Sequence, residues 1–269
     1  MRKDCVAIVT GGSRGIGKGV ALALGETGAT VYVTGRTRRG NAPAIGGTID
    51  DTADEVTARG GRGIACPCDH ANDAEVAAVF ERVDADHGRI DLLVNNVFAI
   101  PDGPMYGVAF WEQPIGVWDT LIDVGLRSHY VASVHAAKRM AAARAGMIAN
   151  ISSFGAASYQ VNVAYGVGKA ALDRMTRDTA RDLAKFGVTV VSLWPGIVRT
   201  ERVLAGQFPY DTSVSESPEL TGRAILAIAG DPERASRSGK AHVVAELAAE
   251  YGFTDVDGTT PASLRKKPR

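Results

Sequence analysis

Cysteine is scarce in this chain. Only three of its 269 residues are cysteines, and so small and odd a number argues against a fold held together by disulfides. Cys66 and Cys68 lie close together, but no second pair of ligands accompanies them. We therefore expect ordinary thiols in a reducing compartment, and no metal site.

Long hydrophobic runs are also missing. No apolar stretch approaches the roughly 18 residues that a membrane-spanning helix needs. The first apolar run, of about five residues, is too short for the core of a signal peptide. We therefore expect a cytoplasmic protein without a membrane span.

Net charge is absent as well, because 30 lysines and arginines balance 30 aspartates and glutamates. This balance does not favour nucleic acid as a partner, so we expect a small-molecule substrate and no nucleic acid. The length and the 45% hydrophobic content suit one large α/β domain better than two small ones. Since no repeat or linker interrupts the chain, we expect a single domain over residues 1–269.

Strand and helix signals alternate along the chain. Short β-branched or apolar runs predict seven strands, at residues 6–9, 30–34, 63–66, 90–94, 147–151, 188–193 and 241–244. Helical patterns lie between them, at about 16–28, 52–59, 73–87, 117–143, 163–185 and 220–229. This alternation predicts an α/β fold: a doubly wound, mostly parallel seven-stranded sheet with helices on both faces.

Several polar motifs follow these strands directly. They are a glycine-rich loop at residues 10–17, the Asn95 region, the Ser152-Ser153 pair and Pro195-Gly196. In parallel sheets of this kind the ligand lies beyond the carboxyl ends of the strands. We therefore expect these motifs to meet in one crevice.

The glycine-rich loop reads TGGSRGIG from residue 10 to residue 17, between the first strand and the first helix, and includes Ser13, Arg14 and Ile16. Gly11 permits a tight turn, Gly15 lets the backbone approach a pyrophosphate, and Gly17 permits close helix–strand packing. The N–H groups of the helix N-terminus would then bind the phosphates. The loop predicts dinucleotide binding, with an ordinary glycine-rich turn as the alternative.

The end of the second strand favours NADP(H) over NAD. An acidic residue there would bind a free ribose hydroxyl, but the strand runs into Gly35-Arg36 with no acid. Arg36 and Arg14 are placed to bind a 2′-phosphate, unless both are simply solvated. Asp69 is a candidate adenine contact or a cap for the helix that starts near Asn72. Asn95 is a candidate for the region of the adenosine ribose.

A candidate catalytic group lies at Tyr165 and Lys169. Four residues apart on a helix, they share one face, and a nearby ammonium lowers the pKa of a phenol. Such a phenol can exchange a proton with an alcohol or ketone. Ser152 and Ser153 could hydrogen-bond the same substrate oxygen. The Tyr-x3-Lys pattern alone is common in unrelated helices, so its weight comes from the glycine-rich loop.

Together these residues resemble the short-chain dehydrogenase/reductase family over residues 6 to about 244. The resemblance implies a Rossmann-type fold, with Tyr165 as general acid/base and Lys169 lowering its pKa and binding the nicotinamide ribose. Either Ser152 or Ser153 would polarise the substrate carbonyl, and the motif slightly favours Ser153. The segment Pro195, Gly196, Ile197, Val198 and Thr200 would bind the carboxamide end of the cofactor. A homodimer or homotetramer formed through the two long helices is also implied.

Residues 109–112, 124–130, 165–169, 192–201 and 247–258 resemble a narrower branch of NADP(H)-linked carbonyl reductases, with steroid-like and xenobiotic carbonyls among its substrates. The chain departs from the wider family at two positions. Gly125 stands where an Asn usually supports a proton-carrying water chain, a feature shared with the narrower branch. Phe98 follows Asn95-Asn96-Val97 where small residues are usual, and its bulk would lie near the adenosine or near the substrate.

Two loops, at about 97–114 and 197–218, are expected to flank the substrate, and residues 245–269 to form a C-terminal extension. Aromatic residues in these loops suit a bulky, apolar carbonyl substrate. The sequence thus predicts an NADP(H)-dependent oxidoreductase, class EC 1.1.1.-. The alternatives are a non-catalytic NADP-binding sensor or scaffold, and an epimerase or dehydratase on the same fold.

Overall fold

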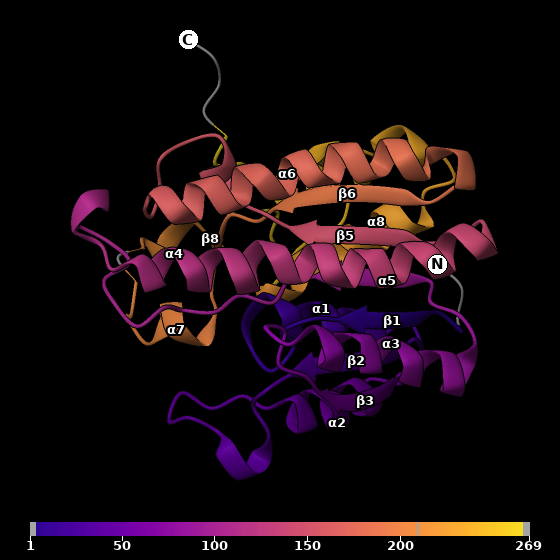
Figure 1. Cartoon of the computed structure of the whole chain (residues 1–269). Coiled ribbons are helices and arrows are strands. Elements are labelled where there is room, and N and C mark those ends of the chain that lie inside the picture. The colour runs from indigo at the N-terminus through magenta and orange to yellow at the C-terminus, as the bar shows by residue number, and fades with distance from the viewer. Residues whose placement is uncertain (1–3, 209, 266–269) are drawn as a thin grey trace.

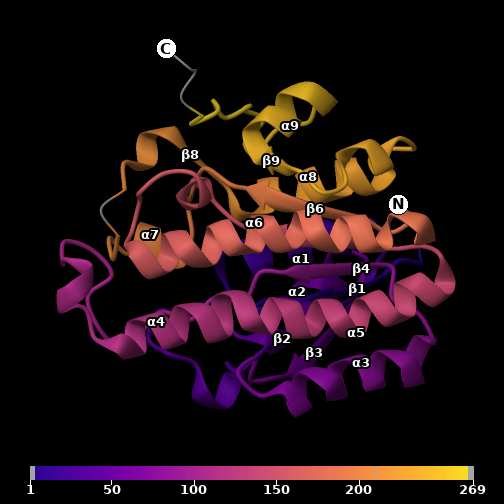
Figure 2. The same ribbon diagram turned by 45° about the horizontal axis from the view of Figure 1, so that its top comes forward.

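A computed structural model describes residues 4–208 and 210–265 (Figures 1 and 2). The strands of the main sheet are β1 (Val6–Val9), β2 (Thr30–Gly35), β3 (Arg62–Pro67), β4 (Leu92–Asn95), β5 (Met147–Ile151), β6 (Thr189–Trp194) and β9 (Ala241–Val243). The α-helices are α1 (Gly15–Gly25), α2 (Ile49–Ala58), α3 (Asp73–His87), α4 (Ile115–Ile122), α5 (Ser128–Ala143), α6 (Val163–Leu183), α7 (Glu201–Leu204), α8 (Pro218–Gly230) and α9 (Val244–Tyr251). The predicted single domain, 1–269, and the C-terminal extension both include residues outside the described ranges.

The main sheet has seven strands in the order β3-β2-β1-β4-β5-β6-β9, and every neighbouring pair is parallel. The predicted α/β fold class is therefore confirmed. After β3 the chain returns to the other side of β1 to form β4. This reversal opens a crevice at the carboxyl ends of β1 and β4, where ligands bind in doubly wound folds.

Both faces of the sheet are covered by helices, which explains the continuous apolar runs of the strands. In β1 the side chains alternate: Ala7 and Val9 join one buried cluster, and Val6 and Ile8 join the other. The first cluster packs against α1, α2, α8 and α9, and the second against α3, α5 and α6. Figures 1 and 2 both show α5 and α6 side by side on one face.

The long helix predicted at 117–143 is instead three segments. A π-helical stretch, Asp123–Arg127, joins α4 to α5 and contains the buried Gly125. Such wide turns are rare and frequently occur at functional sites. The π-helical stretch is short, and the segments on either side of it are α-helical. The helical periodicity in the sequence therefore did not reveal the break.

Other boundaries also differ from the prediction. Helix α2 begins at Ile49, earlier than expected, because Thr48 caps it by accepting a hydrogen bond from the Asp51 N–H at 2.9 Å. The predicted 197–218 loop contains α7 and a two-stranded parallel pair, β7 (Ile197–Val198) and β8 (Ser215–Glu216). The predicted strand 241–244 ends at Val243, and α9 then occupies part of the predicted extension.

Candidate active site

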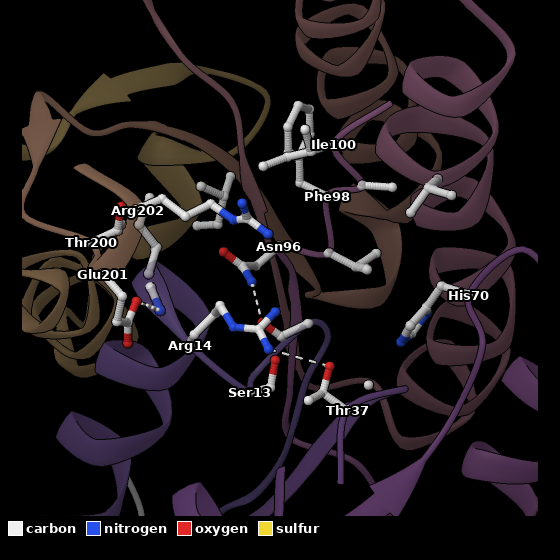
Figure 3. Close-up of a pocket in the computed structure, with 18 of the residues that line it drawn as sticks. Ser13, Arg14, Thr37, His70, Asn96, Phe98, Ile100, Thr200, Glu201 and Arg202 are labelled. Carbon is white, nitrogen blue, oxygen red and sulfur yellow. Dashed lines mark hydrogen bonds between the residues drawn. The ribbon is translucent and has the colours of Figure 1, made fainter. Parts of the chain in front are cut away.

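A cavity of about 470 Å³ opens at the carboxyl ends of β1, β2, β4 and β5 (Figure 3). It brings together residues from motifs far apart in the sequence. The predicted site residues that line it are Gly11, Ser13, Arg14, Gly15, Ile16, Arg36, Asp69, Ser152, Ser153, Tyr165, Lys169, Pro195, Gly196 and Thr200.

The glycine-rich loop forms one end of the cavity. Gly11 has a φ of +67°, and a Cβ atom there would come within 2.7 Å of the Val97 Cα atom. Gly17 does not line the cavity, and a Cβ on it would lie 2.4 Å from the Gly11 carbonyl oxygen. Gly17 therefore serves close packing between the loop and α1 rather than contact with a ligand.

Helix α1 presents its N-terminus to the cavity, and its N-cap residue, Arg14, contributes no side-chain cap. The Glu201 carboxylate instead accepts a hydrogen bond from the Gly15 N–H at 2.8 Å, as Figure 3 shows. The carboxylate thus occupies the kind of position that suits an anion, because N–H groups and the helix dipole converge there. No local pattern in the sequence indicates this contact, since Glu201 lies on α7, 186 residues along the chain from Gly15.

Three arginines surround this end of the cavity. Arg14 donates hydrogen bonds to the carbonyl oxygens of Gly46 and Gly47 at 3.1 and 3.0 Å, and to the Thr37 hydroxyl at 3.3 Å. Burial lowers the pKa of Arg14, and the positive charge of Arg202 lowers it further. Two cations held this close favour a bound anion. Arg202 and Thr37 were not predicted from the sequence. Thr37 directly follows the predicted site residue Arg36, and Arg202 lies two residues after the predicted Thr200.

At the end of β2, Arg36 is mostly exposed and forms an ion pair with Asp69 at 3.7 Å. Asp69 also accepts a hydrogen bond from the Ala71 N–H, but Asn72 caps α3. The capping alternative for Asp69 is therefore wrong. His70, also missed, lines the cavity and shares a 2.7 Å hydrogen bond with Thr34.

Three further residues predicted to bind cofactor do not line the cavity. Asn95 is fully buried, and its side-chain amide donates to Ser133 and Asn150 at 2.9 Å each. Strand alternation turns the Asn95 side chain away from the cavity, while the next residue, Asn96, lines it. Ile197 and Val198 pair with β8, away from the cavity lining.

The hydroxyl groups of Tyr165 and Ser153 meet inside the cavity. Tyr165 donates a hydrogen bond to the Ser153 Oγ atom at 2.9 Å. That oxygen also accepts from the Gly155 N–H at 3.0 Å. Because Ser153 accepts both bonds, its own hydroxyl hydrogen is available to a third partner.

Ser152 and Lys169 lie deeper. Ser152 is buried and donates to the backbone carbonyl of Lys169 at 3.3 Å. The Lys169 ammonium donates to the Ile151 carbonyl at 2.9 Å and lies 5.8 Å from the centre of the Tyr165 ring. Of the two serines, Ser153 is thus the one hydrogen-bonded to the tyrosine hydroxyl.

The expected lowering of the tyrosine pKa does not occur in the protein alone. Burial raises the pKa of Tyr165 to about 12, and the hydrogen bond with Ser153 opposes this only in part. Burial also lowers the pKa of Lys169 to about 8, while the charge of Asp173 acts to raise it. Desolvation is therefore the largest effect on the pKa of both groups.

Phe98 and Gly125, the two departures noted in the sequence, lie against each other. A Cβ atom on Gly125 would be 3.7 Å from the Phe98 Cδ2 atom. The Phe98 ring packs edge-on against the Tyr165 ring, with centroids 6.0 Å apart, and lies under the Lys169 ammonium at 5.7 Å. Phe98 therefore belongs to the Tyr165–Lys169 end of the cavity.

Aromatic side chains connect the two predicted substrate loops. The hydroxyls of Tyr106 and Tyr210 are hydrogen-bonded at 2.8 Å, and Phe208, which lines the cavity, packs beside both rings. Phe110 and Trp111 are largely exposed and lie outside the cavity lining. Only some of the loop aromatics thus approach the site.

The described residues form neither a metal-binding cluster nor a membrane-spanning helix. No group of three or more His, Cys, Asp or Glu residues suited to a metal ion is found within residues 4–208 and 210–265. None of the helices that these residues form combines the length and apolarity needed to cross a bilayer. Cys5, Cys66 and Cys68 are free and buried.

The chain is similar to known proteins over most of its length. Residues 5–205 match the family described as short chain dehydrogenase. The chain is 42% identical over 272 residues to "Dehydrogenase/reductase SDR family member 1" of Mus musculus, covering 95% of this chain and 84% of that protein. It is 43% identical over 269 residues to the Homo sapiens protein of the same name, covering 94% and 83%.

Solved structures show the same fold. The crystal structure of a putative dehydrogenase from Xanthomonas campestris superposes with a TM-score of 0.83 at 26% sequence identity, over 98% of both chains. The chain therefore belongs to the short-chain dehydrogenase family, as predicted, and the narrower resemblance is confirmed as similarity to dehydrogenase/reductase SDR family member 1.

Proposed function

Because the chain belongs to the short-chain dehydrogenase family, we propose that it is an NADP(H)-dependent oxidoreductase that interconverts a carbonyl compound and its alcohol. The observation that carries the proposal is the 2.9 Å hydrogen bond between Tyr165 and Ser153, in the same cavity as the glycine-rich loop. A proton donor and a nucleotide-binding loop thus share one space.

The residues present fit a dinucleotide. The Gly15 N–H already binds a carboxylate, and the crowding of Arg14 with Arg202 would be relieved by a phosphate. When bound, the nicotinamide supplies or accepts the hydride. We assign the phosphates to the glycine-rich loop and the nicotinamide end to Lys169, Pro195-Gly196 and Thr200, which all line the cavity.

This chain's own residues handle the proton. In reduction, the Ser153 hydroxyl donates a hydrogen bond to the substrate carbonyl oxygen and polarises the carbonyl, while keeping its own proton. Tyr165 then gives its hydroxyl proton to that oxygen as the alcohol forms. Lys169, positively charged below a pH of about 8, stabilises the negative charge left on the phenol oxygen.

The preference for NADP(H) over NAD rests on Arg14, Arg36 and the absence of an acid at the end of β2. Arg36 is exposed and its partner, Asp69, holds it loosely at 3.7 Å, so its guanidinium can turn to a 2′-phosphate. Thr37 provides a further hydroxyl beside Arg14.

The substrate proposed is a ketone or aldehyde, bulky and apolar or steroid-like. The rings of Phe98 and Phe208 line the cavity, and the Tyr106–Tyr210 pair lies next to Phe208. Such walls favour apolar ligands that carry one polar group for Ser153 and Tyr165.

We also infer a cytoplasmic homodimer or homotetramer built from one domain per chain. Exposed apolar side chains on α4 and α6 support an interface, since Ile115 is 76% exposed and Trp118 and Val167 are each 43% exposed.

The test is the oxidation of NADPH, followed by its absorbance, with a graded panel of aldehydes, ketones and steroid ketones. Wild-type protein should turn over several bulky ketones, and Tyr165→Phe should lose roughly 100-fold or more in kcat because the proton donor is gone. Full activity in Tyr165→Phe would show that the mechanism is wrong.

Two alternatives give different results in the same assay. A non-catalytic sensor or scaffold would bind NADPH tightly and turn over no carbonyl in the panel. An epimerase or dehydratase would form product with no net change in NADPH. Product analysis by chromatography beside the absorbance trace separates the three.

A further inference from the structure

A second cavity, of about 660 Å³, lies beside α6, one helical turn beyond Lys169. It shares no lining residue with the first cavity. Asp173 lines it, together with Trp194 and the cationic side chains of Arg174, Arg177 and Lys240. A cavity of this size with charged walls has room for water.

Asp173 is held in place by hydrogen bonds to both of its carboxylate oxygens. The Ser192 hydroxyl donates to one oxygen at 2.6 Å, and the Trp194 indole N–H donates to the other at 3.0 Å. Two accepting oxygens are the pattern of an ionised carboxylate, because a protonated acid would use one oxygen as a donor.

Asp173 is also near, along α6, to the buried lysine that lines the first cavity. Asp173 and Lys169 are four residues apart on α6, so they lie on one face of the helix. The carboxylate therefore lines the second cavity and lies on the helix face that also carries the buried lysine.

No ion pair within 4.0 Å joins Lys169 to another described side chain, although its ammonium is buried. Asp173 is the charged group that acts to raise the pKa of Lys169 against the effect of burial. From α5, His129 also faces the lysine, but burial lowers the pKa of this histidine to about 3 and keeps it neutral. The charge of Lys169 lowers the pKa of Asp173 in return, although burial leaves that pKa raised.

We propose that Asp173 is a positioning residue of this active site: its carboxylate, fixed by Ser192 and Trp194 and reached by solvent through the second cavity, is the counter-charge that keeps the buried Lys169 ammonium ionised. The proposal rests on the proposed function, because the charge of Lys169 matters to turnover only if Tyr165 acts as the proton donor.

The first test measures Lys169 directly in the cofactor-free protein. The Cε signals of ¹³C-labelled lysines are followed by NMR against pH, and the Lys169 signal is assigned by its absence in Lys169→Arg. In Asp173→Asn the titration midpoint of Lys169 should fall by roughly one pH unit, because a nearby opposite charge is lost. Asp173→Glu should restore most of the wild-type midpoint.

Asp178→Asn is the matched control. Asp178 lies on the same helix, pairs with Arg174 at 2.7 Å and is exposed. Its substitution therefore removes the same charge at a site farther along the helix from Lys169. The midpoint should stay at the wild-type value in this variant. A wild-type midpoint in Asp173→Asn, or an equal fall in both variants, would overturn the proposal.

The second test measures turnover. With a ketone accepted by the wild type, Asp173→Asn should move the alkaline fall of kcat to lower pH by the same amount, with little change in the KM for the ketone. A uniform loss of kcat at every pH would indicate a structural role and contradict the proposal. If the wild type turns over no carbonyl while the lysine midpoint still shifts, the proposed function fails and the charge relationship stands.

Discussion

The ammonium nitrogen of Lys169 lies 5.7 Å from the centre of the Phe98 ring, which itself packs against the position of Gly125. The ring face offers the buried cation a favourable electrostatic contact. The ring can take this place because Gly125 has no side chain to compete for it. Two unusual residues in separate segments thus form one structural feature beside the proposed proton donor.

Phe98→Leu keeps the apolar bulk and removes the ring. We expect kcat to fall roughly three- to twentyfold, the range that a desolvated cation–π contact supports. The pH at which kcat falls should also decrease, because the ammonium loses a stabilising contact. Steady-state kinetics across pH would check this, and an unchanged pH profile would argue against the contact.

Gly125→Asn should also lower turnover, because the added amide would push the Phe98 ring away from Lys169. Gly125→Ala is the matched control: its Cβ atom sits at an ordinary 3.7 Å contact distance, so activity should remain close to wild type. The double variant Phe98→Ala with Gly125→Asn should recover part of the loss. Additive losses in the double variant would show that the two positions act independently.

The pH dependence of reduction follows from the two perturbed groups. The pKa of Lys169 is lowered to about 8, so its ammonium is charged below that pH and lost above it. The pKa of Tyr165 is raised to about 12, so the phenol keeps its proton throughout the neutral range. We expect kcat for reduction to be level below pH 8 and to fall above it. A fall that begins near the ordinary lysine pKa of about 10.4 would contradict this assignment.

Arg36→Asp should change the cofactor preference. The new carboxylate would repel a 2′-phosphate and accept a hydrogen bond from a free ribose hydroxyl. We expect the ratio of kcat/KM for NADPH over NADH to fall by roughly 100-fold, or about 2.7 kcal/mol. Arg38→Asp is the control, because Arg38 pairs with Asp50 and does not line the cavity. An equal effect in both variants would indicate a general change of charge.

Glu201→Gln should tighten NADPH binding. The carboxylate of Glu201 occupies the Gly15 N–H and would repel a phosphate that approaches the N-terminus of α1. We expect the Kd for NADPH to fall roughly three- to tenfold, which is the scale of a charge at a helix terminus. Isothermal titration calorimetry would measure it. Glu219→Gln, in the first turn of α8, should leave the Kd unchanged. Weaker binding in Glu201→Gln would mean that the carboxylate assists the cofactor.

Local patterns in the sequence were enough to predict much of this molecule. The apolar runs predicted the seven strands because strands covered on both faces are apolar throughout. Tyr165 and Lys169 could be placed on one face because helix geometry fixes the relation of residues four apart. The glycine-rich loop could be recognised because its backbone turns are possible only with glycine at set positions.

Other features could not be read from neighbouring residues. Ser152 and Ser153 are adjacent and chemically alike, yet the backbone directs only Ser153 to the Tyr165 hydroxyl. Asn95 and Asn96 are likewise alike, and strand alternation sends one into the sheet and the other to the cavity. The family motif favoured Ser153 only slightly, because the sequence does not contain the direction of a side chain at the end of a strand.

By itself, the sequence determined the order of the elements, the nucleotide-binding loop and the spacing of the tyrosine and the lysine, since these depend on contacts within a few residues. Only the tertiary structure decided that Glu201 meets the Gly15 N–H and that Phe98 fills the space beside Gly125. It also decided that burial raises the pKa of Tyr165. Each of these depends on how distant segments exclude water from one another, and that is set by the packing of the whole fold.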